Sequence, residues 1–136
     1  MPELFIKHDA RTVTIRLPLP PSANHYWQSF VPKGGTRAIT HTSNEAKRFQ
    51  RDVQAAWLFH HGSIPPAITG KIRLTVIVCQ RDRRVIDLDN RLKPLQDALA
   101  KCGAFEDDKQ IDELHVSRGT ITPPDGCCYV TLETME

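Results

Sequence analysis

The sequence predicts an α/β (α+β) fold: a two-layer sandwich in which one mixed sheet of about four strands carries two helices on one face. Four segments alternate apolar and polar residues as half-buried strands do, and two segments repeat apolar residues at helical intervals. Their order along the chain is β-α-β-α-β-β. The 136 residues, of which 40% are hydrophobic and 25% charged, suit one soluble domain over residues 1–136.

The regular structure is expected to begin with a strand. Residues 12–17 alternate branched apolar with polar side chains and stop at Pro18. Three prolines without a backbone N–H then predict a fixed, extended loop over residues 18–24. The glycines, proline and basic residues of segment 28–41 predict a mobile basic loop.

A first helix and a second strand follow. Residues 42–45 have the spacing of a capping box, and apolar side chains then recur at helical intervals, which predicts a helix over about residues 43–60. On this helix, Trp57 is expected to be buried more deeply than Phe59. Alternating apolar residues then predict a strand over residues 72–78.

Leucines repeat on one face of a second predicted helix, which ends at Gly103. Pro94 is tolerated only in the first turn of a helix, because deeper inside it would remove a hydrogen bond and clash with the preceding turn. The helix is therefore expected to begin near residues 89–91, with Asp89 or Asn90 as its N-cap.

Two further strands are predicted over residues 111–121 and 127–132, joined by a turn rich in proline, aspartate and glycine. Cys127 and Cys128 fall in the second of these strands and should point to opposite faces. The four cysteines form no C-x-x-C pair, so we expect them to be reduced and structural. No apolar run is long enough to span a membrane and the start does not read as a signal peptide, so a cytoplasmic location is expected.

The net charge of +2 neither demands nor forbids a polyanionic partner, but the charges are segregated. Basic residues dominate segment 33–51, acidic residues dominate segment 104–113, and segment 81–93 mixes both signs. Taken singly, each run is compatible with an ordinary solvated surface.

Asp87 and Asp89 precede the second helix, and Asp107 and Asp108 follow it. If residues 87–89 are extended, Asp87 and Asp89 project to the same side and repel each other unless a cation or proton intervenes. Hard oxygen ligands favour Mg²⁺ or Mn²⁺, which suits phosphodiester cleavage. The alternative is that these aspartates only cap helices.

Lys93 lies four residues after Asp89, so the two side chains are expected to meet on one helical face. They would form either an ordinary surface ion pair or a site at which the Lys93 ammonium contacts a substrate phosphate.

Three blocks of sequence together resemble the RusA-type Holliday junction resolvases. They are Pro-Pro-Ser-Ala-Asn within residues 17–24, Asp-Leu-Asp-Asn with Lys93 and Asp-Ala-Leu within residues 87–99, and Asp-Asp-Lys-Gln-Ile at residues 107–111. The resemblance covers nearly the whole chain in order and spacing, and the three blocks are far more specific together than D-x-D-N alone.

The resemblance implies a homodimeric, Mg²⁺-dependent endonuclease that makes paired nicks across a four-way DNA junction. Mn²⁺ would be able to substitute, no small-molecule cofactor is implied, and the nicks would carry 5′-phosphate and 3′-hydroxyl ends. By motif position, Asp87, Asp89 and Asp108 would bind the metal and Lys93 would be the catalytic lysine. Asp107 remains an alternative to Asp108.

A protein that holds DNA needs basic groups to replace condensed counterions. The residues expected to contact DNA are Asn24, which falls on the motif asparagine, and Lys33, Arg37, Arg81, Arg83, Arg84 and Arg91. No recognition-helix or zinc-finger pattern is visible, so recognition of DNA shape is expected rather than base reading. A symmetric dimer would present identical sites to two strands.

Two other functions stay open: a catalytically idle module that binds junction DNA, and an interaction domain whose aspartates are only caps and surface charge. The histidines lack the spacing of a zinc site. Tyr26, Trp27 and Phe30 are interpreted as core or dimer packing rather than as platforms for unpaired bases.

Overall fold

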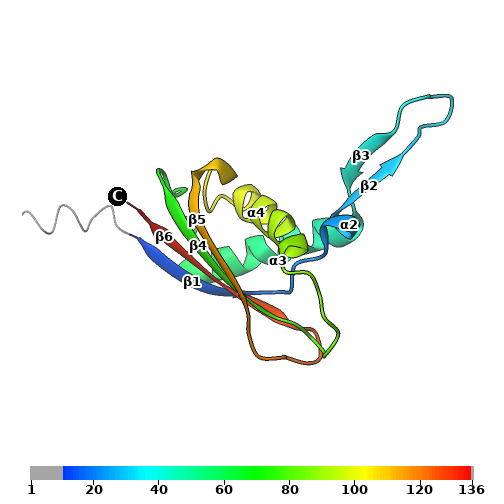
Figure 1. Cartoon of the computed structure of the whole chain (residues 1–136). Coiled ribbons are helices and arrows are strands. Elements are labelled where there is room, and N and C mark those ends of the chain that lie inside the picture. The colour runs from blue at the N-terminus through cyan, green and yellow to red at the C-terminus, as the bar shows by residue number, and fades with distance from the viewer. Residues whose placement is uncertain (1–10, 136) are drawn as a thin grey trace, which may run out of the picture.

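The computed structural model describes residues 11–135, apart from the side chains of residues 27, 28, 30 and 39. It confirms the predicted mixed sheet, whose strand order is β1-β6-β4-β5 (Figure 1). Its strands are β1 (Thr12–Leu17), β4 (Ile72–Cys79), β5 (Ile111–Arg118) and β6 (Cys127–Thr134). β4 and β5 run parallel, whereas β6 is antiparallel to both of its neighbours.

Two helices, α3 (Asn44–His61) and α4 (Leu92–Lys101), pack against each other and cover one face of the sheet. The alternation of β4 explains this, because its even-numbered residues from Ile72 to Val78 are buried. Trp57 of α3 is 1% exposed and Phe59 is 91% exposed, which confirms the predicted order of burial. Over residues 11–135, no helix is long and apolar enough to cross a membrane.

The prediction of a mobile basic loop at residues 28–41 is wrong for both ends of that segment. β2 (Trp27–Phe30) and β3 (Ile39–Thr42) pair as an antiparallel hairpin, here called the arm (residues 27–42). The proline and glycines are confined to the middle of the segment, and the flanking residues include the aromatic and β-branched types that favour strands. Figure 1 shows the arm projecting away from the sheet and helices.

The predicted extended loop at residues 18–24 ends earlier than expected, because α2 (Ala23–Tyr26) forms one helical turn. The Ser22 carbonyl accepts a hydrogen bond from the His25 N–H at 3.0 Å, which closes this turn. The prolines lie just before it, where a missing backbone N–H costs no helical hydrogen bond.

Tyr26 anchors α2 to both large helices. Its side chain is fully buried, and its hydroxyl donates to Asp97 Oδ2 of α4 at 2.5 Å. Gln50 of α3 donates a hydrogen bond to the same hydroxyl. Burial and the Asp97 carboxylate raise the pKa of Tyr26, so the phenol stays protonated and remains a donor. Tyr26 therefore confirms the packing interpretation, while the side chains of Trp27 and Phe30 lie outside the described residues.

The N-cap of α3 is Ser43, whose hydroxyl accepts a hydrogen bond from the Ala46 N–H at 3.1 Å. The capping-box spacing of residues 42–45 would place the cap one residue earlier, at Thr42. Thr42 instead remains in β3, paired with Trp27, and this tertiary pairing moves the start of the helix to Asn44.

The prediction that Asp89 or Asn90 caps the second helix is wrong. A 3₁₀ turn, η1 (Asp89–Arg91), precedes α4, and no side chain caps either element. The Leu92 N–H bonds to the Asp89 carbonyl, so the backbone of η1 provides what a capping side chain would supply. Pro94 lies in the first turn of α4, as predicted.

The last two strands have different lengths from those predicted. β5 ends at Arg118 rather than at residue 121, because β4 ends at Cys79 and the β4–β5 pairing stops at Val78 and Arg118. β6 extends to Thr134 because its pairing with β1 and β4 continues that far. Cys128 belongs to the main core cluster, whereas Cys127 pairs with Cys79 outside it, because adjacent residues of a strand face opposite sides. All four cysteines are free and buried.

Candidate active site

The segment between β4 and η1, residues 80–88, is braced by two polar side chains. Gln80 donates hydrogen bonds to the carbonyls of Asp82 and Arg84, each at 2.7 Å. Arg118 of β5 donates to Gln80 Oε1 at 3.1 Å and to the Ile86 carbonyl at 2.7 Å. Sequence reasoning missed both residues, because a side chain that bonds to loop backbone leaves no periodic pattern.

Gly126 allows the turn before β6 to pack on the base of this segment. Its φ is 73°, a conformation that favours glycine. A Cβ at this position would lie 2.7 Å from the Cys79 carbonyl oxygen and 3.0 Å from the Arg81 nitrogen. The turn predicted from the Pro-Pro-Asp-Gly sequence therefore also holds the arginine-bearing segment in place.

Asp87 and Asp89 are both exposed, and Asp89 opens η1. Leu88 between them has φ −63° and ψ −44°, which is helical, so the condition under which the two carboxylates would project to the same side is not met. Neither carboxylate forms a hydrogen bond or ion pair within residues 11–135, and Asp89 caps no helix. Both carboxylates are therefore free to bind a ligand.

Lys93 contacts Asp108 rather than Asp89. Its ammonium forms an ion pair with Asp108 Oδ2, at the start of the 3₁₀ turn η2 (Asp108–Gln110) that follows α4. The i,i+4 expectation fails because Asp89 belongs to η1 and not to the α-helix. The two side chains are 58% and 32% exposed. The hydrogen bond from Lys93 lowers the pKa of the Asp108 carboxyl below its ordinary value.

Asp107 has a different role from Asp108. It is the N-cap of η2, and its Oδ1 accepts a hydrogen bond from the Lys109 N–H at 2.9 Å. Gln110 completes a capping box by accepting from the Asp107 N–H at 3.0 Å. The cap interpretation therefore applies to Asp107, whereas Asp108 presents its carboxylate to Lys93.

The donor set fits a hard cation by its chemistry. Asp87 and Asp89 have uncommitted carboxylate oxygens, and Asp108 is ionised beside Lys93. Within the described residues, no group of three or more histidine, cysteine, aspartate or glutamate side chains is already arranged to hold a metal ion. Asp87, Asp89 and Asp108 therefore do not form such a group in this structure.

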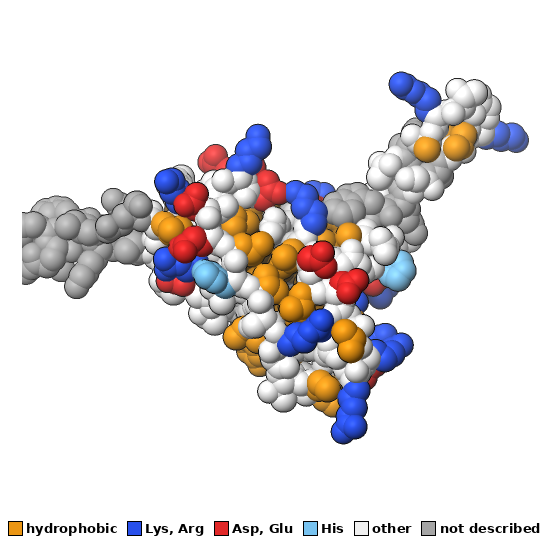
Figure 2. Space-filling model, viewed as in Figure 1, with side chains coloured by type: hydrophobic (Ala, Val, Ile, Leu, Met, Phe, Trp, Pro, Cys, Tyr) orange, Lys and Arg blue, Asp and Glu red, His pale blue; other side chains and the backbone are white. Residues whose placement is uncertain are grey.

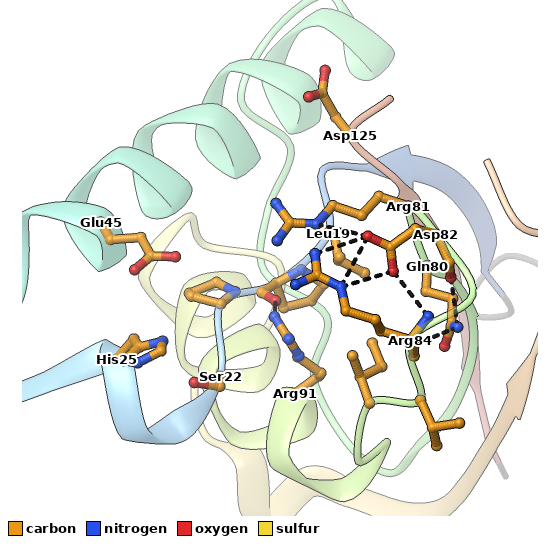
Figure 3. A pocket seen from close by; sticks show the side chains of 14 residues that line it. Leu19, Ser22, His25, Glu45, Gln80, Arg81, Asp82, Arg84, Arg91 and Asp125 are labelled. Carbon is orange, nitrogen blue, oxygen red and sulfur yellow. Dashed lines mark hydrogen bonds and ion pairs between the residues drawn. The ribbon is translucent and has the colours of Figure 1, made fainter. Parts of the chain in front are cut away.

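The residues predicted to contact DNA fall in separate places. Arg81, Arg84 and Arg91 line a cavity of about 430 Å³, seen in Figure 3. Arg83 is exposed on the same segment but does not line the cavity, and Asn24 is exposed on α2. Lys33 and Arg37 are exposed on the arm, and Figure 2 shows basic side chains at its far end.

Unpaired carboxylates, a lysine–aspartate pair and an arginine-rich cavity are typical of proteins that act on phosphate esters. The chain belongs to the RusA endodeoxyribonuclease family, because residues 18–125 match the family model described as Endodeoxyribonuclease RusA. It is therefore an enzyme of a nuclease class.

Individual relatives carry matching names. Crossover junction endodeoxyribonuclease rusA of Enterobacteria phage HK97 is 36% identical over 107 residues, which cover 79% of this chain and 82% of the relative. Crossover junction endodeoxyribonuclease RusA of Escherichia coli (strain K12) is 31% identical over 111 residues, which cover 82% and 86%. The protein of the same name from Enterobacteria phage 82 is also 31% identical over 111 residues.

Proposed function

We propose that the chain is a Mg²⁺-dependent endonuclease that resolves four-way DNA junctions by paired nicks, with Mn²⁺ able to substitute. The observation that carries the proposal is that the Asp87 and Asp89 carboxylates have no partner within the described residues, on the segment that also bears the cavity arginines. The relatives' names, crossover junction endodeoxyribonuclease, support the choice of substrate.

Asp87, Asp89 and Asp108 would hold the ion. When bound, Mg²⁺ offsets charge on the scissile phosphate and lowers the pKa of a bound water. We assign the third position to Asp108 and not Asp107, because the Asp107 carboxylate is already engaged as the cap of η2. Lys93 lies against Asp108, and we assign it the role of contacting the phosphate and stabilising negative charge in the transition state.

The proposed reaction is hydrolysis. The oxygen of water forms a bond to phosphorus, and the bond from phosphorus to the 3′ oxygen breaks. The 3′ oxygen takes up a proton and water loses one, so the nick carries a 5′-phosphate and a 3′-hydroxyl. A free carboxylate at Asp87 or Asp89 can orient the water or accept its proton.

The arginines of segment 81–91 and the basic residues of the arm would replace counterions along the DNA. A homodimer would place one site on each of two strands, as the near-twofold symmetry of a four-way junction requires. We also propose a cytoplasmic location, which the four free, buried cysteines support.

The test uses purified protein and an end-labelled four-way junction, with and without Mg²⁺. Wild type should cut two opposed strands only when the ion is present, and DNA ligase should reseal the nicks because the ends are 5′-phosphate and 3′-hydroxyl. Asp87→Asn, Asp89→Asn and Asp108→Asn should abolish cutting and bind DNA as tightly as wild type or more tightly, since each removes a negative charge near phosphate.

Asp52→Asn is the matched control, because Asp52 is an exposed aspartate of α3 that forms no ion pair within residues 11–135. It should cut like wild type. Junction binding by wild type without any cutting would favour the idle module instead. Equal, weak affinity for junction and duplex would favour the interaction domain. Sedimentation of the wild type as a monomer at working concentration would contradict the homodimer.

A further inference from the structure

The hydrolysis step proposed above does not use the arginine-lined cavity, and the general role given to its arginines does not say which phosphate the cavity would bind. The cavity lies between the segment before α2, the segment after β4 and η1. Figure 3 shows Ser22, Arg81 and Arg91 from these three segments around it. Residues 19–22, His25, residues 80–82, residues 84–86 and Arg91 line it, together with Glu45 and Asp125. None of Asp87, Asp89, Lys93 or Asp108 does so. The cavity is thus separate from the proposed metal ligands.

Arg91 is partly buried in this cavity without a counterion. Its Nη1 donates a hydrogen bond to the Pro20 carbonyl at 2.6 Å, and no acidic side chain within residues 11–135 forms an ion pair with it. Burial lowers the pKa of the Arg91 guanidinium; the charge of Arg81 lowers it further, and Glu45 opposes this. A partly buried charge is normally paired, so Arg91 is suited to receive an anion.

Ser22 lines the same cavity and offers a second donor. The residue is only 9% exposed, and its hydroxyl oxygen is buried with no hydrogen-bond partner. Figure 3 shows Ser22 beside His25 and Arg91. A buried hydroxyl without a partner is costly, and an oxyanion would relieve that cost by accepting its hydrogen bond.

The acidic residues of the cavity do not meet this need. Asp82 is held by Arg84 through contacts of 2.8 to 3.2 Å and by Arg81 at 3.8 Å. Glu45 and Asp125 form no ion pair with any described residue. Arg91 is therefore left as the unneutralised arginine of the cavity, and a guanidinium matches the geometry of a phosphate through two parallel hydrogen bonds.

We propose that the cavity binds a non-scissile backbone phosphate of the DNA strand being cut, with Arg91 and Ser22 as its principal donors. This inference rests on the proposed endonuclease function. Arg91 and Asp89 lie two residues apart in η1, and phosphates of one strand are spaced by about 3.4 Å along the helix axis. The bound phosphate would therefore lie within a few nucleotides of the scissile one and would set the position of the strand relative to the carboxylates.

The experiment measures junction binding in EDTA, so that no cutting occurs. A set of four-way junctions carries one uncharged methylphosphonate each, at successive positions near the crossover. Wild type should lose about tenfold or more in affinity at one non-scissile position, the loss expected for a charge-assisted hydrogen bond. Arg91→Gln should bind the unmodified junction more weakly by a similar factor and should show no further loss at that position.

Arg83→Gln is the matched control, because Arg83 is an exposed arginine of the same segment that does not line the cavity. It should weaken binding at every position and keep the wild-type pattern. The proposal is overturned if Arg91→Gln also keeps that pattern.

Ser22→Ala provides a second test that does not disturb the contact between Arg91 and Pro20. Removing an unpartnered buried hydroxyl should leave the thermal midpoint unchanged or higher, yet weaken junction binding about threefold or more. Wild-type affinity in this variant would exclude Ser22 as a donor and contradict the proposal.

Inorganic phosphate distinguishes a free anion from a DNA strand. Suppose calorimetry finds that wild type binds phosphate and that Arg91→Gln does not, while no methylphosphonate position lowers junction affinity more than the others. In that case the cavity binds a free anion, and the proposal that it binds a phosphate of the DNA strand is wrong. Failure of the endonuclease proposal gives a different result. Wild type would then leave junctions uncut in the presence of Mg²⁺, whatever affinities the methylphosphonate junctions show in EDTA.

Discussion

Lys93→Ala removes the ammonium that contacts the Asp108 carboxylate. The pair is partly exposed, so its loss should change the free energy of unfolding by less than about 1 kcal/mol. The effect on metal binding should be larger. Two unit charges about 4 Å apart interact by about 1 kcal/mol in water. At that distance the Lys93 ammonium would repel a divalent ion held by Asp108 by about twice this energy, and Lys93→Ala removes the repulsion. A gain of about 2 kcal/mol corresponds to a roughly 30-fold higher affinity, which is the upper value expected.

Electron paramagnetic resonance of Mn²⁺ measures the binding, and single-turnover cleavage measures the rate. Lys93→Ala should bind Mn²⁺ more tightly by up to about 30-fold. It should cut about 100-fold more slowly, because a group that stabilises transition-state charge is lost. Lys101→Ala is the control, since Lys101 also lies on α4 and pairs with Asp97 at 3.6 Å. Unchanged or weaker Mn²⁺ binding in Lys93→Ala would refute the idea that Lys93 and the ion share Asp108.

Three further outcomes are expected. Asp107→Ala should lower the free energy of unfolding by about 1 kcal/mol, because the cap of η2 is lost, and should cut DNA almost as fast as wild type. Asp108→Asn should stop cutting. Denaturation and cleavage assays compare the two variants, and an equal loss of cutting would mean that Asp107 is also a metal ligand. Tyr26→Phe should lower the free energy of unfolding in urea by about 1–3 kcal/mol, because the half-buried Asp97 carboxylate loses the donor of its shortest hydrogen bond. A variant as stable as wild type would contradict the network. The pKa of Asp108 is lowered in the fold, so its stabilising contribution is present above the unfolded-state value of about 3.9 and is lost as the pH falls through the folded-state value. Carboxyl NMR titration of the metal-free protein should place this pKa below that of an ordinary aspartate and find it raised in Lys93→Ala.

The parts of the fold that the sequence predicted well depend on local physics. β4 was recognisable because alternate side chains of a strand face opposite sides, and α4 because leucines recur on one helical face. Pro94 then limited where α4 could begin. The arm was missed because the glycines and proline of its loop outweighed the strand-forming residues on either side. Its pairing between residues 27–30 and 39–42 depends on contacts across that loop.

Features that depend on tertiary contacts were not predictable from local patterns. Lys93 pairs with Asp108, which lies 15 residues later in the sequence, beyond the C-terminal end of α4. It does not pair with Asp89, which lies only four residues before it. The choice between Asp107 and Asp108 stayed open because adjacent aspartates look alike until one of them is seen to cap η2. The phosphate-binding roles proposed for Ser22 and Arg91 depend on a cavity between three chain segments. The sequence could not predict that cavity, although it showed Ser22 within the Pro-Pro-Ser-Ala-Asn block.

The central claim is that Asp87, Asp89 and Asp108 together bind one or more divalent ions at the nucleic-acid backbone. The most direct test is anomalous diffraction from crystals soaked in Mn²⁺. We predict density within direct coordination distance of all three carboxylates, with Asp107 still hydrogen-bonded to the Lys109 N–H. Strong Mn²⁺ density elsewhere, with these three side chains left without an ion, would contradict the account.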